Sequence, residues 1–264
     1  ANTEISLLAH VRNNILDPPH GKEEEQQSNT TARSDVLHSI DTFCTSRHWM
    51  MHIGPQKGDI LLSALRQSIF DKRHRSSTSG QFIVVELGTY CAYASILMGR
   101  LMHQAQTATM KCHVFTTEIH PQYVTVANEM IQLSSMEDMI SVHPVEFNGS
   151  GTNMVSVVKG AIEKFNTTKK PKIDFLFIDH DKDSYKSDLM KLEASGMIGY
   201  RTRVVADNVV FAGIYDYVGY MQQRKREGIV ETKTVQCMVE YSTESTNDKN
   251  LEDGIEITDY LRDP

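Results

Sequence analysis

The sequence predicts an α/β fold in which helices cover both faces of a doubly wound, mostly parallel sheet of seven strands. Short apolar runs alternate with helical patterns through the middle of the chain, which is typical of βαβ units. Near the C-terminus, two apolar runs follow each other without a convincing helix between them, which indicates a closing antiparallel hairpin. With 264 residues, 40% of them hydrophobic, the chain is long enough to bury the core that such a sheet requires.

The first eighty residues are expected to form an extension and a helical cover. Residues 18–33 are polar, which predicts an exposed loop. Ser34 or Asp35 can cap the helix that follows, and a second helix is expected after residues 54–59. Both helices are predicted from apolar side chains at helical spacing: Val36, Leu37, Ile40 and Phe43 in the first, and Ile60, Leu61, Ala64, Leu65 and Phe70 in the second.

The α/β core is expected to begin at residue 81. Its parallel strands are predicted at residues 82–88, 113–119, 140–147, 173–179 and 203–208. The helices between them are predicted at residues 92–103, 123–133, 154–165 and 185–192, and the hairpin strands at 234–241 and 254–261. Because no internal repeat is found, we expect one domain over residues 1–264, made of a polar N-terminal extension (1–33), a helical cover (34–80) and the α/β core (81–264).

Charge and cysteine usage exclude several classes of protein. The net charge is −7, so no global positive field exists to hold nucleic acid or an anionic membrane. The four cysteines form no paired motif, which is typical of reduced thiols in a cytoplasmic protein. No apolar run approaches the roughly 18 residues of a membrane span, and no signal-peptide pattern is present. The chain begins with Ala1 and not with Met, so an upstream anchor or leader is compatible with the sequence. We expect a cytoplasmic monomer.

Four of the five expected parallel strands end in an acidic residue: Glu86, Glu118, Asp179 and Asp207. Ligands of such sheets bind at the carboxyl ends of the strands, so four acids on one rim favour a binding site over four solvated turns. Gly88 allows a tight turn after the first strand, but the full GxGxxG pattern of a dinucleotide site is absent. Glu118 is placed to accept hydrogen bonds from ribose hydroxyls.

The stretch "DFLFIDHDKDSYKSD" (174–188) is compatible with a polar loop, a calcium loop or the mouth of an active site. The calcium loop fails, because Ser184 stands where the motif needs glycine and Met190 where it needs glutamate. Asp179, with Asp207 and Asn208, instead forms an all-oxygen set that suits Mg²⁺. Lys182 is either a salt-bridged surface lysine or, beside a cation and partly out of water, a general base.

Five motifs then resemble one family. "WMMHIGPQKG" (49–58), "ELGTYCAY" (86–93), "FIDHDKDSY" (177–185), "ADNV" (206–209) and "VEY" (239–241) occur in the order and spacing of the animal-type catechol O-methyltransferases. The resemblance covers about residues 35 to 245. The D-x-D-K-D-x-Y form of the third motif is also similar to the metal-dependent caffeoyl-CoA O-methyltransferases. The resemblance implies a class I methyltransferase fold, S-adenosylmethionine as the donor and Mg²⁺ as the metal.

The resemblance also implies roles for individual residues. Asp179, Asp207 and Asn208 match the metal ligands, and Lys182 matches the general base. Glu240 matches the acid that holds the second hydroxyl of the catechol. The positions that match cofactor contacts are Met51, Ile53, Glu86, Gly88, Tyr90, Tyr93, Glu118, Ile119, Asp179 and His180. The positions expected to line the substrate pocket are Trp49, Met51, Asp179, Lys182, Asn208 and Glu240.

The chain departs from the family's pattern at several positions. Ala92 and Ala94 replace the usual glycine and serine, so the serine's contact near the methionyl carboxylate passes to Ser95, passes to water or is lost. The adenine-contacting Ser-Gln has no clean counterpart near residues 146–148. Asp181 replaces a tryptophan and could accept a hydrogen bond from the adenine amino group, the alternative being an exposed carboxylate. Ala212 replaces a proline, so we expect a different wall of the substrate pocket.

The function predicted from the sequence is Mg²⁺-dependent methyl transfer from S-adenosylmethionine to one hydroxyl of a small-molecule catechol, with Lys182 as the base. A second hypothesis within the enzymes is a caffeoyl-CoA-type enzyme that acts on a larger vicinal-dihydroxy phenylpropanoid. Outside the enzymes, Ala92 and Ala94 leave open a methyltransferase-fold protein that binds without catalysis, although the retained metal set, Lys182 and Glu240 argue against it.

Overall fold

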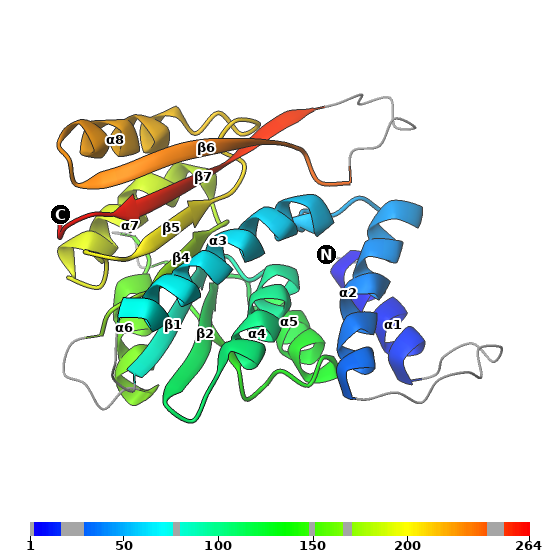
Figure 1. The fold of residues 1–264 in the computed structure, drawn as a ribbon. Coiled ribbons are helices and arrows are strands. Elements are labelled where there is room, and N and C mark those ends of the chain that lie inside the picture. Colours follow the sequence, from blue (N-terminus) through cyan, green and yellow to red (C-terminus); the bar gives the residue numbers. More distant parts are fainter. Residues whose placement is uncertain (1–2, 17–28, 76–79, 148–150, 166–170, 242–250) are drawn as a thin grey trace.

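Seven strands form one sheet that runs through the molecule (Figure 1). The computed structural model describes residues 3–16, 29–75, 80–147, 151–165, 171–241 and 251–264. The strands are β1 (Gly80–Leu87), β2 (Met110–Glu118), β3 (Ile140–Pro144), β4 (Phe175–Ile178), β5 (Arg203–Ala206), β6 (Val230–Met238) and β7 (Glu252–Tyr260). Their order in the sheet is β3-β2-β1-β4-β5-β7-β6, so the connections reverse direction between β1 and β4. Such a switch point is where doubly wound sheets bind ligands.

The parallel strands and the hairpin confirm the predicted topology. The first five strands pair in parallel, β7 pairs antiparallel with β5, and β6 closes the edge antiparallel to β7. The crossover helices are α4 (Tyr93–Ala105), α5 (Pro121–Leu133), α6 (Met154–Phe165) and α7 (Tyr185–Ala194). Each lies within two residues of its expected start and end, because apolar periodicity is a local signal.

One helix of the core was not predicted. α8 (Tyr215–Arg226) connects β5 to β6 and packs beside the hairpin (Figure 1). Only two of its side chains are fully buried, Tyr217 and Met221, so the apolar stripe is too sparse to dominate the polar pattern. The signals that were available are the four-residue spacing of those two side chains and the basic last turn, which favours a helix C-terminus.

The N-terminal region is more helical than the sequence suggested. α1 (Thr3–Leu16) lies within the segment expected to be a polar extension. It packs against α2 and α5, and its Leu7, Leu8 and Val11 are buried. α2 (Asn29–Ser46) begins before the expected cap at Ser34 or Asp35, so residues 29–33 are helical and not loop. The rest of the expected loop, residues 18–28, lies outside the described residues.

α3 (Gly54–Arg75) also begins earlier than expected. Residues 54–59, which were expected to precede the helix, form its first turns. Figure 1 shows α1 and α2 side by side next to α5, and α3 lying across one face of the sheet. Among the described helices, none combines the length and the apolar character that crossing a membrane requires.

Two apolar layers enclose the sheet, one on each face. Neighbouring residues of β1 point to opposite layers, with Phe82 and Val84 facing the N-terminal helices, and Ile83 and Val85 facing α6 to α8. This pattern is expected for parallel strands that are buried on both sides. The two layers cover the faces of the sheet, so polar groups gather at the carboxyl ends of its strands.

Candidate active site

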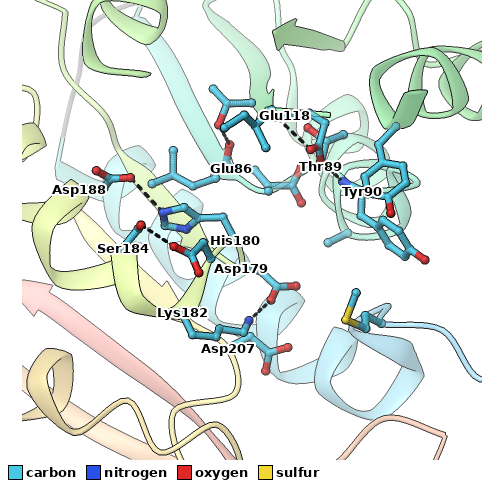
Figure 2. Close-up of a pocket in the computed structure, with 18 of the residues that line it drawn as sticks. Glu86, Thr89, Tyr90, Glu118, Asp179, His180, Lys182, Ser184, Asp188 and Asp207 are labelled. Carbon is cyan, nitrogen blue, oxygen red and sulfur yellow. Dashed lines mark hydrogen bonds and ion pairs between the residues drawn. The ribbon is translucent and has the colours of Figure 1, made fainter. Parts of the chain in front are cut away.

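A cavity of about 970 Å³ lies at the carboxyl ends of β1, β2, β4 and β5. The four acids that end these strands, Glu86, Glu118, Asp179 and Asp207, all line it. Figure 2 shows them in two groups, with Glu86 and Glu118 toward one end and Asp179 and Asp207 toward the other. The parallel topology therefore brings together acids that are up to 121 residues apart in the sequence.

All but one of the predicted site residues line this cavity. They are Trp49, Met51, Ile53, Glu86, Gly88, Tyr90, Tyr93, Glu118, Ile119, Asp179, His180, Asp181, Lys182, Asp207, Asn208 and Glu240. The exception is Ser95, which is fully buried and donates its hydroxyl hydrogen bond to the carboxylate of Glu86. The partner of Ser95, Glu86, does line the cavity, and a contact of Ser95 with the cofactor stays a prediction.

The turn from β1 into α4 shapes one wall of the cavity. Gly88 has φ of +97°, and a Cβ atom at this position would lie 2.4 Å from the carbonyl oxygen of Asp179. Glycine is required because the backbone that follows β4 approaches so closely. Tyr90 and Ala92 also have positive φ, at 48° and 65°. α4 then begins without a side-chain cap, so its first N–H groups remain available beside Tyr93 and Ala94 in the wall.

The two tyrosines of this wall connect the site to the N-terminal helices. Tyr90 Oη donates a hydrogen bond to Glu4 of α1 at 2.9 Å, and Tyr93 Oη donates to Asp41 of α2, also at 2.9 Å. His52 lies against both rings, with centroid distances of 5.1 Å and 5.6 Å. Burial lowers the pKa of His52 to about 3, so the imidazole is neutral. This histidine is also part of the cavity wall.

Two buried carboxylates distinguish the β1–β2 end of the cavity. Burial raises the pKa of Glu86 to about 8, and the hydroxyl of Ser95 opposes that shift. Glu118 accepts three backbone N–H groups, from Tyr90, Ile119 and His120, each at 2.9 Å. A carboxylate offers about four acceptor directions, so Glu118 has capacity for a further donor from the cavity.

These groups fit S-adenosylmethionine chemically. The carboxylate of Glu86 suits the ammonium group of an amino acid, and the uncapped start of α4 suits its carboxylate. Glu118 suits ribose hydroxyls, as predicted. Asp181 is exposed and accepts a hydrogen bond from Ser184 Oγ at 2.7 Å, and it lines the cavity beside His180. Its proposed contact with adenine stays a prediction.

At the opposite end, Lys182 is held by two neighbours. Its Nζ donates to Asp179 Oδ1 at 2.7 Å and to the hydroxyl of Tyr185 at 2.8 Å. Tyr185 is fully buried, and its own hydroxyl donates to the carbonyl oxygen of Asp207 at 3.3 Å. Burial, with the charge of Asp179 as the second cause, keeps the pKa of Tyr185 well above its ordinary value, so the phenol stays neutral. Lys182 remains about one-third exposed and faces the cavity.

The sequence reasoning missed a buried lysine at this end. Lys57, in the first turns of α3, is completely buried, and its Nζ lies 2.6 Å from Asp253, 2.8 Å from Glu240 and 3.1 Å from Asp207. Burial, with Asp179 as the second cause, raises the pKa of Asp207 above its usual range, and Lys57 opposes that shift. The only signal in the sequence was the position of Lys57 inside one of the quoted motifs, where it had been given no role.

The proposed metal ligands also fit a hard cation in their chemistry. In the described part of the chain, no three His, Cys, Asp or Glu side chains are grouped to hold a metal ion. Asp179, Asp207 and Asn208 supply two carboxylates and one amide, which suits Mg²⁺ only if water or substrate completes the shell. Asn208 directs its Nδ2 to Asp253 at 2.9 Å, which leaves its carbonyl oxygen for another partner.

Apolar side chains form the mouth of the cavity near the acids. The side chains of Trp49 and Met51 are 54% and 62% exposed, and that of Phe211, in the segment after β5, is 53% exposed. All three line the cavity. Trp49 is fixed by a hydrogen bond from its indole Nε1 to the carbonyl oxygen of Glu240 at 3.0 Å. A flat aromatic ring could therefore enter between apolar walls and reach the carboxylates beneath.

The sheet order, the cavity at the switch point and the carboxylate set define a class I methyltransferase. The O-methyltransferase family profile matches residues 76–217, and the chain belongs to this family. It is 29% identical to catechol O-methyltransferase of Mus musculus over 219 residues, which cover 83% of this chain and 68% of the mouse protein. It is 30% identical to catechol O-methyltransferase B of Danio rerio, over 72% of this chain and 62% of the fish protein.

Solved structures show the same fold. An O-methyltransferase from Bacillus cereus in complex with SAH superposes with a TM-score of 0.56, over 98% of this chain and 99% of the bacterial one. At 15% identity this similarity shows the fold alone. The predicted resemblance to the catechol O-methyltransferases is confirmed, and S-adenosylmethionine is the donor that the family indicates.

Proposed function

We propose that the protein transfers a methyl group from S-adenosylmethionine to one hydroxyl of a catechol, in a reaction that requires Mg²⁺. The observation that carries this proposal is the single cavity whose one end holds Glu86 and Glu118 and whose other end holds Asp179, Lys182 and Asp207. The first end suits the donor, and the second suits a cation and a dihydroxy acceptor. The similarity to two catechol O-methyltransferases supports the choice of acceptor.

Making the nucleophile is the costly part of this reaction. A phenol with a pKa near 10 is only about 0.1% ionised at pH 7, which corresponds to roughly 4 kcal/mol. Mg²⁺ at Asp179, Asp207 and Asn208 would supply positive charge that lowers the pKa of a nearby hydroxyl. In this proposal, Nζ of Lys182 accepts the hydroxyl proton. The oxygen then forms the new bond to the methyl carbon as the carbon–sulfur bond breaks, and the sulfonium becomes a neutral thioether.

Two further groups position the acceptor in this proposal. Glu240 accepts a hydrogen bond from the second hydroxyl, and Trp49 and Met51 cover the ring from the mouth. The carboxylate of Glu240 is well ordered for this role, because Lys57 holds one of its oxygens. Alignment of oxygen, methyl and sulfur then contributes several kcal/mol through proximity. The four cysteines are free and buried, which is compatible with the proposed cytoplasmic location.

The test of this function is a methylation assay with labelled S-adenosylmethionine and dihydroxybenzoate, with and without a chelator. We expect turnover that disappears with the chelator and returns with Mg²⁺. Lys182→Met should lower kcat by about 10²- to 10⁴-fold while donor and catechol affinities are kept. Lys186→Met is the matched control, because Lys186 lies four residues further along and does not line the cavity. Full turnover by Lys182→Met would refute the base assignment.

A larger vicinal-dihydroxy substrate is the second candidate, and it is favoured by one observation. Ala212 lines the cavity next to Phe211, at a position where the catechol family has a bulkier proline. Turnover of a catechol ester of the phenylpropanoid type, with none of dihydroxybenzoate, would support this second candidate over the first.

A further inference from the structure

Lys57 and Asp253 form a buried ion pair directly behind the proposed cation site. Lys57 comes from α3 and Asp253 from β7, and these elements pack together (Figure 1). Both side chains are completely buried, and the distance from Lys57 Nζ to Asp253 Oδ2 is 2.6 Å. An ammonium has three donors, and Lys57 directs them to Asp253, Glu240 and Asp207. A buried lysine is tolerated here because each donor meets a carboxylate.

Asp253 accepts four hydrogen bonds and can donate none. Its Oδ2 receives Lys57 Nζ and Asn208 Nδ2, the latter at 2.9 Å. Its Oδ1 receives the backbone N–H of Phe211 at 2.9 Å and that of Gly254 at 2.7 Å. All the directions in which an ionised carboxylate accepts hydrogen bonds are thus used. Asp253 therefore holds both the Asn208 side chain and the loop that follows β5.

This arrangement fixes the orientation of the Asn208 amide. Because a carboxylate only accepts, Asn208 must present its nitrogen to Asp253 and its oxygen to the opposite side. An oxygen is what a hard cation requires, and a flipped amide would present N–H groups to it. In parallel, Lys57 fixes the carboxylates of Asp207 and Glu240. One ion pair thus sets the direction of three side chains of the proposed site.

The charge balance supports the same interpretation. Among the described residues, the carboxyl groups of Asp179, Asp207, Glu240 and Asp253 form ion pairs with two lysines, Lys57 and Lys182. The four carboxyl groups outnumber the two lysines, and a divalent cation would reduce the repulsion among them. Without Lys57 the excess would be larger, and the buried acids would repel one another or take up protons.

We propose that Asp253, together with Lys57, is a positioning residue that pre-orients the ligands of a divalent cation. The inference rests on the proposed function, because it takes Asp179, Asp207 and Asn208 as those ligands. Asp253 does not contact the cation or the reacting atoms in this assignment. It acts through Asn208 directly, and through Lys57 on Asp207 and Glu240.

Asp253→Asn is the first test, because it keeps the size of the side chain. Its new NH₂ group must face either Lys57 and Asn208 or the two backbone N–H groups, and all four are donors. If it faces Asn208, the Asn208 amide turns and offers its nitrogen to the cation. If it faces the backbone, the loop after β5 must move. Either way, we expect the apparent Kd for Mn²⁺ to rise about 10- to 100-fold.

The measurement is Mn²⁺ binding to the full chain without donor or acceptor, followed by the spin-resonance signal of free Mn²⁺ and by competition with Mg²⁺. Asp259→Asn is the matched control, since it makes the same change on the same strand, at a partly exposed carboxylate paired with Arg203. Without a cation, SAH affinity should be the same in the wild type, Asp253→Asn and Asp259→Asn. A variant that had lost its overall structure would bind SAH more weakly, so this measurement separates loss of structure from loss of the cation site.

A double variant covers the case in which Asp253→Asn fails to fold. Lys57→Met with Asp253→Leu removes the pair without changing the net charge, and apolar replacements of buried ion pairs are often tolerated. We expect it also to bind Mn²⁺ at least tenfold more weakly than the wild type. Mn²⁺ affinity within twofold of the wild type in either folded variant would overturn the positioning role alone. No Mn²⁺ binding by the wild type would overturn the metal part of the proposed function, and this inference with it.

Discussion

Replacing Gly88 by alanine should destabilise the protein and weaken donor binding at the same time. The new Cβ would lie 2.4 Å from the carbonyl oxygen of Asp179 and 2.9 Å from the Cα of His180. Both neighbours are backbone atoms, so no flexible side chain can move aside. The turn after β1 and the segment after β4 must separate, and this separation moves Asp179, which lines the cavity.

The magnitude follows from two costs and one gain. Holding a side chain at a φ of +97° costs about 1–3 kcal/mol. Overpacking against rigid neighbours costs about 1–3 kcal/mol more. Alanine has fewer conformations than glycine in the unfolded chain, and this difference stabilises the folded state by about 0.4–1 kcal/mol. We therefore expect a net loss of about 1–6 kcal/mol, which for a chain of this length lowers Tm by roughly 2–24 °C.

The assay is urea unfolding, combined with titration of SAH into the folded protein. Gly160→Ala is the control, because Gly160 lies inside α6 and a Cβ there meets no atom within 4 Å. That variant should gain up to about 1 kcal/mol, the difference in helix propensity between the two residues. If Gly88→Ala loses less than about 1 kcal/mol and binds SAH as the wild type does, the close-approach argument is wrong.

Three other predictions concern buried polar groups. The folded pKa of His52, about 3, lies below its unfolded value of 6.5, so the unfolded state binds the extra proton between these pH values and stability falls as pH decreases. Between pH 7.5 and pH 5, His52 should lower the free energy of unfolding by about 2 kcal/mol. In urea unfolding, the free energy of unfolding of His52→Asn should therefore fall by about 2 kcal/mol less than that of the wild type over the same pH range. Glu118→Gln places an NH₂ group against backbone donors and should weaken SAH binding about tenfold in calorimetry; unchanged affinity would contradict this. Asp174→Asn breaks the pair with Lys72 while leaving an acceptor for the N–H of Ile83, and thermal unfolding should show a loss of about 1–2 kcal/mol.

The sheet was predictable because its signals are local. Each parallel strand is a short apolar run, and each crossover helix repeats its apolar side chains at helical spacing. The errors fall where that signal is weak. α1 lies in a segment assigned to a polar extension, although Leu7, Leu8 and Val11 follow helical spacing and are buried. α8 buries only Tyr217 and Met221, so its polar residues concealed it.

The rim of the site was predictable for a topological reason. Acids at the carboxyl ends of parallel strands meet at one edge, so Glu86, Glu118, Asp179 and Asp207 were expected together and line one cavity. The direction of a side chain could not be predicted in the same way, because it depends on neighbours that are distant in sequence. Ser95 was one of three alternatives for the contact near the methionyl carboxylate, and the sequence did not show that its hydroxyl donates to Glu86.

By itself, the sequence determined the alternation of parallel strands with crossover helices, the closing hairpin and the acidic strand ends, because each depends on residues close together in the chain. The buried ion pair behind the acidic strand ends, between Lys57 and Asp253, was decided by tertiary structure alone. Lys57 looks like a surface lysine in its motif, and Asp253 lies 196 residues further along. The packing of α3 against β5, β6 and β7 brings both side chains together out of water, and the cost of burying either charge alone favours the pair.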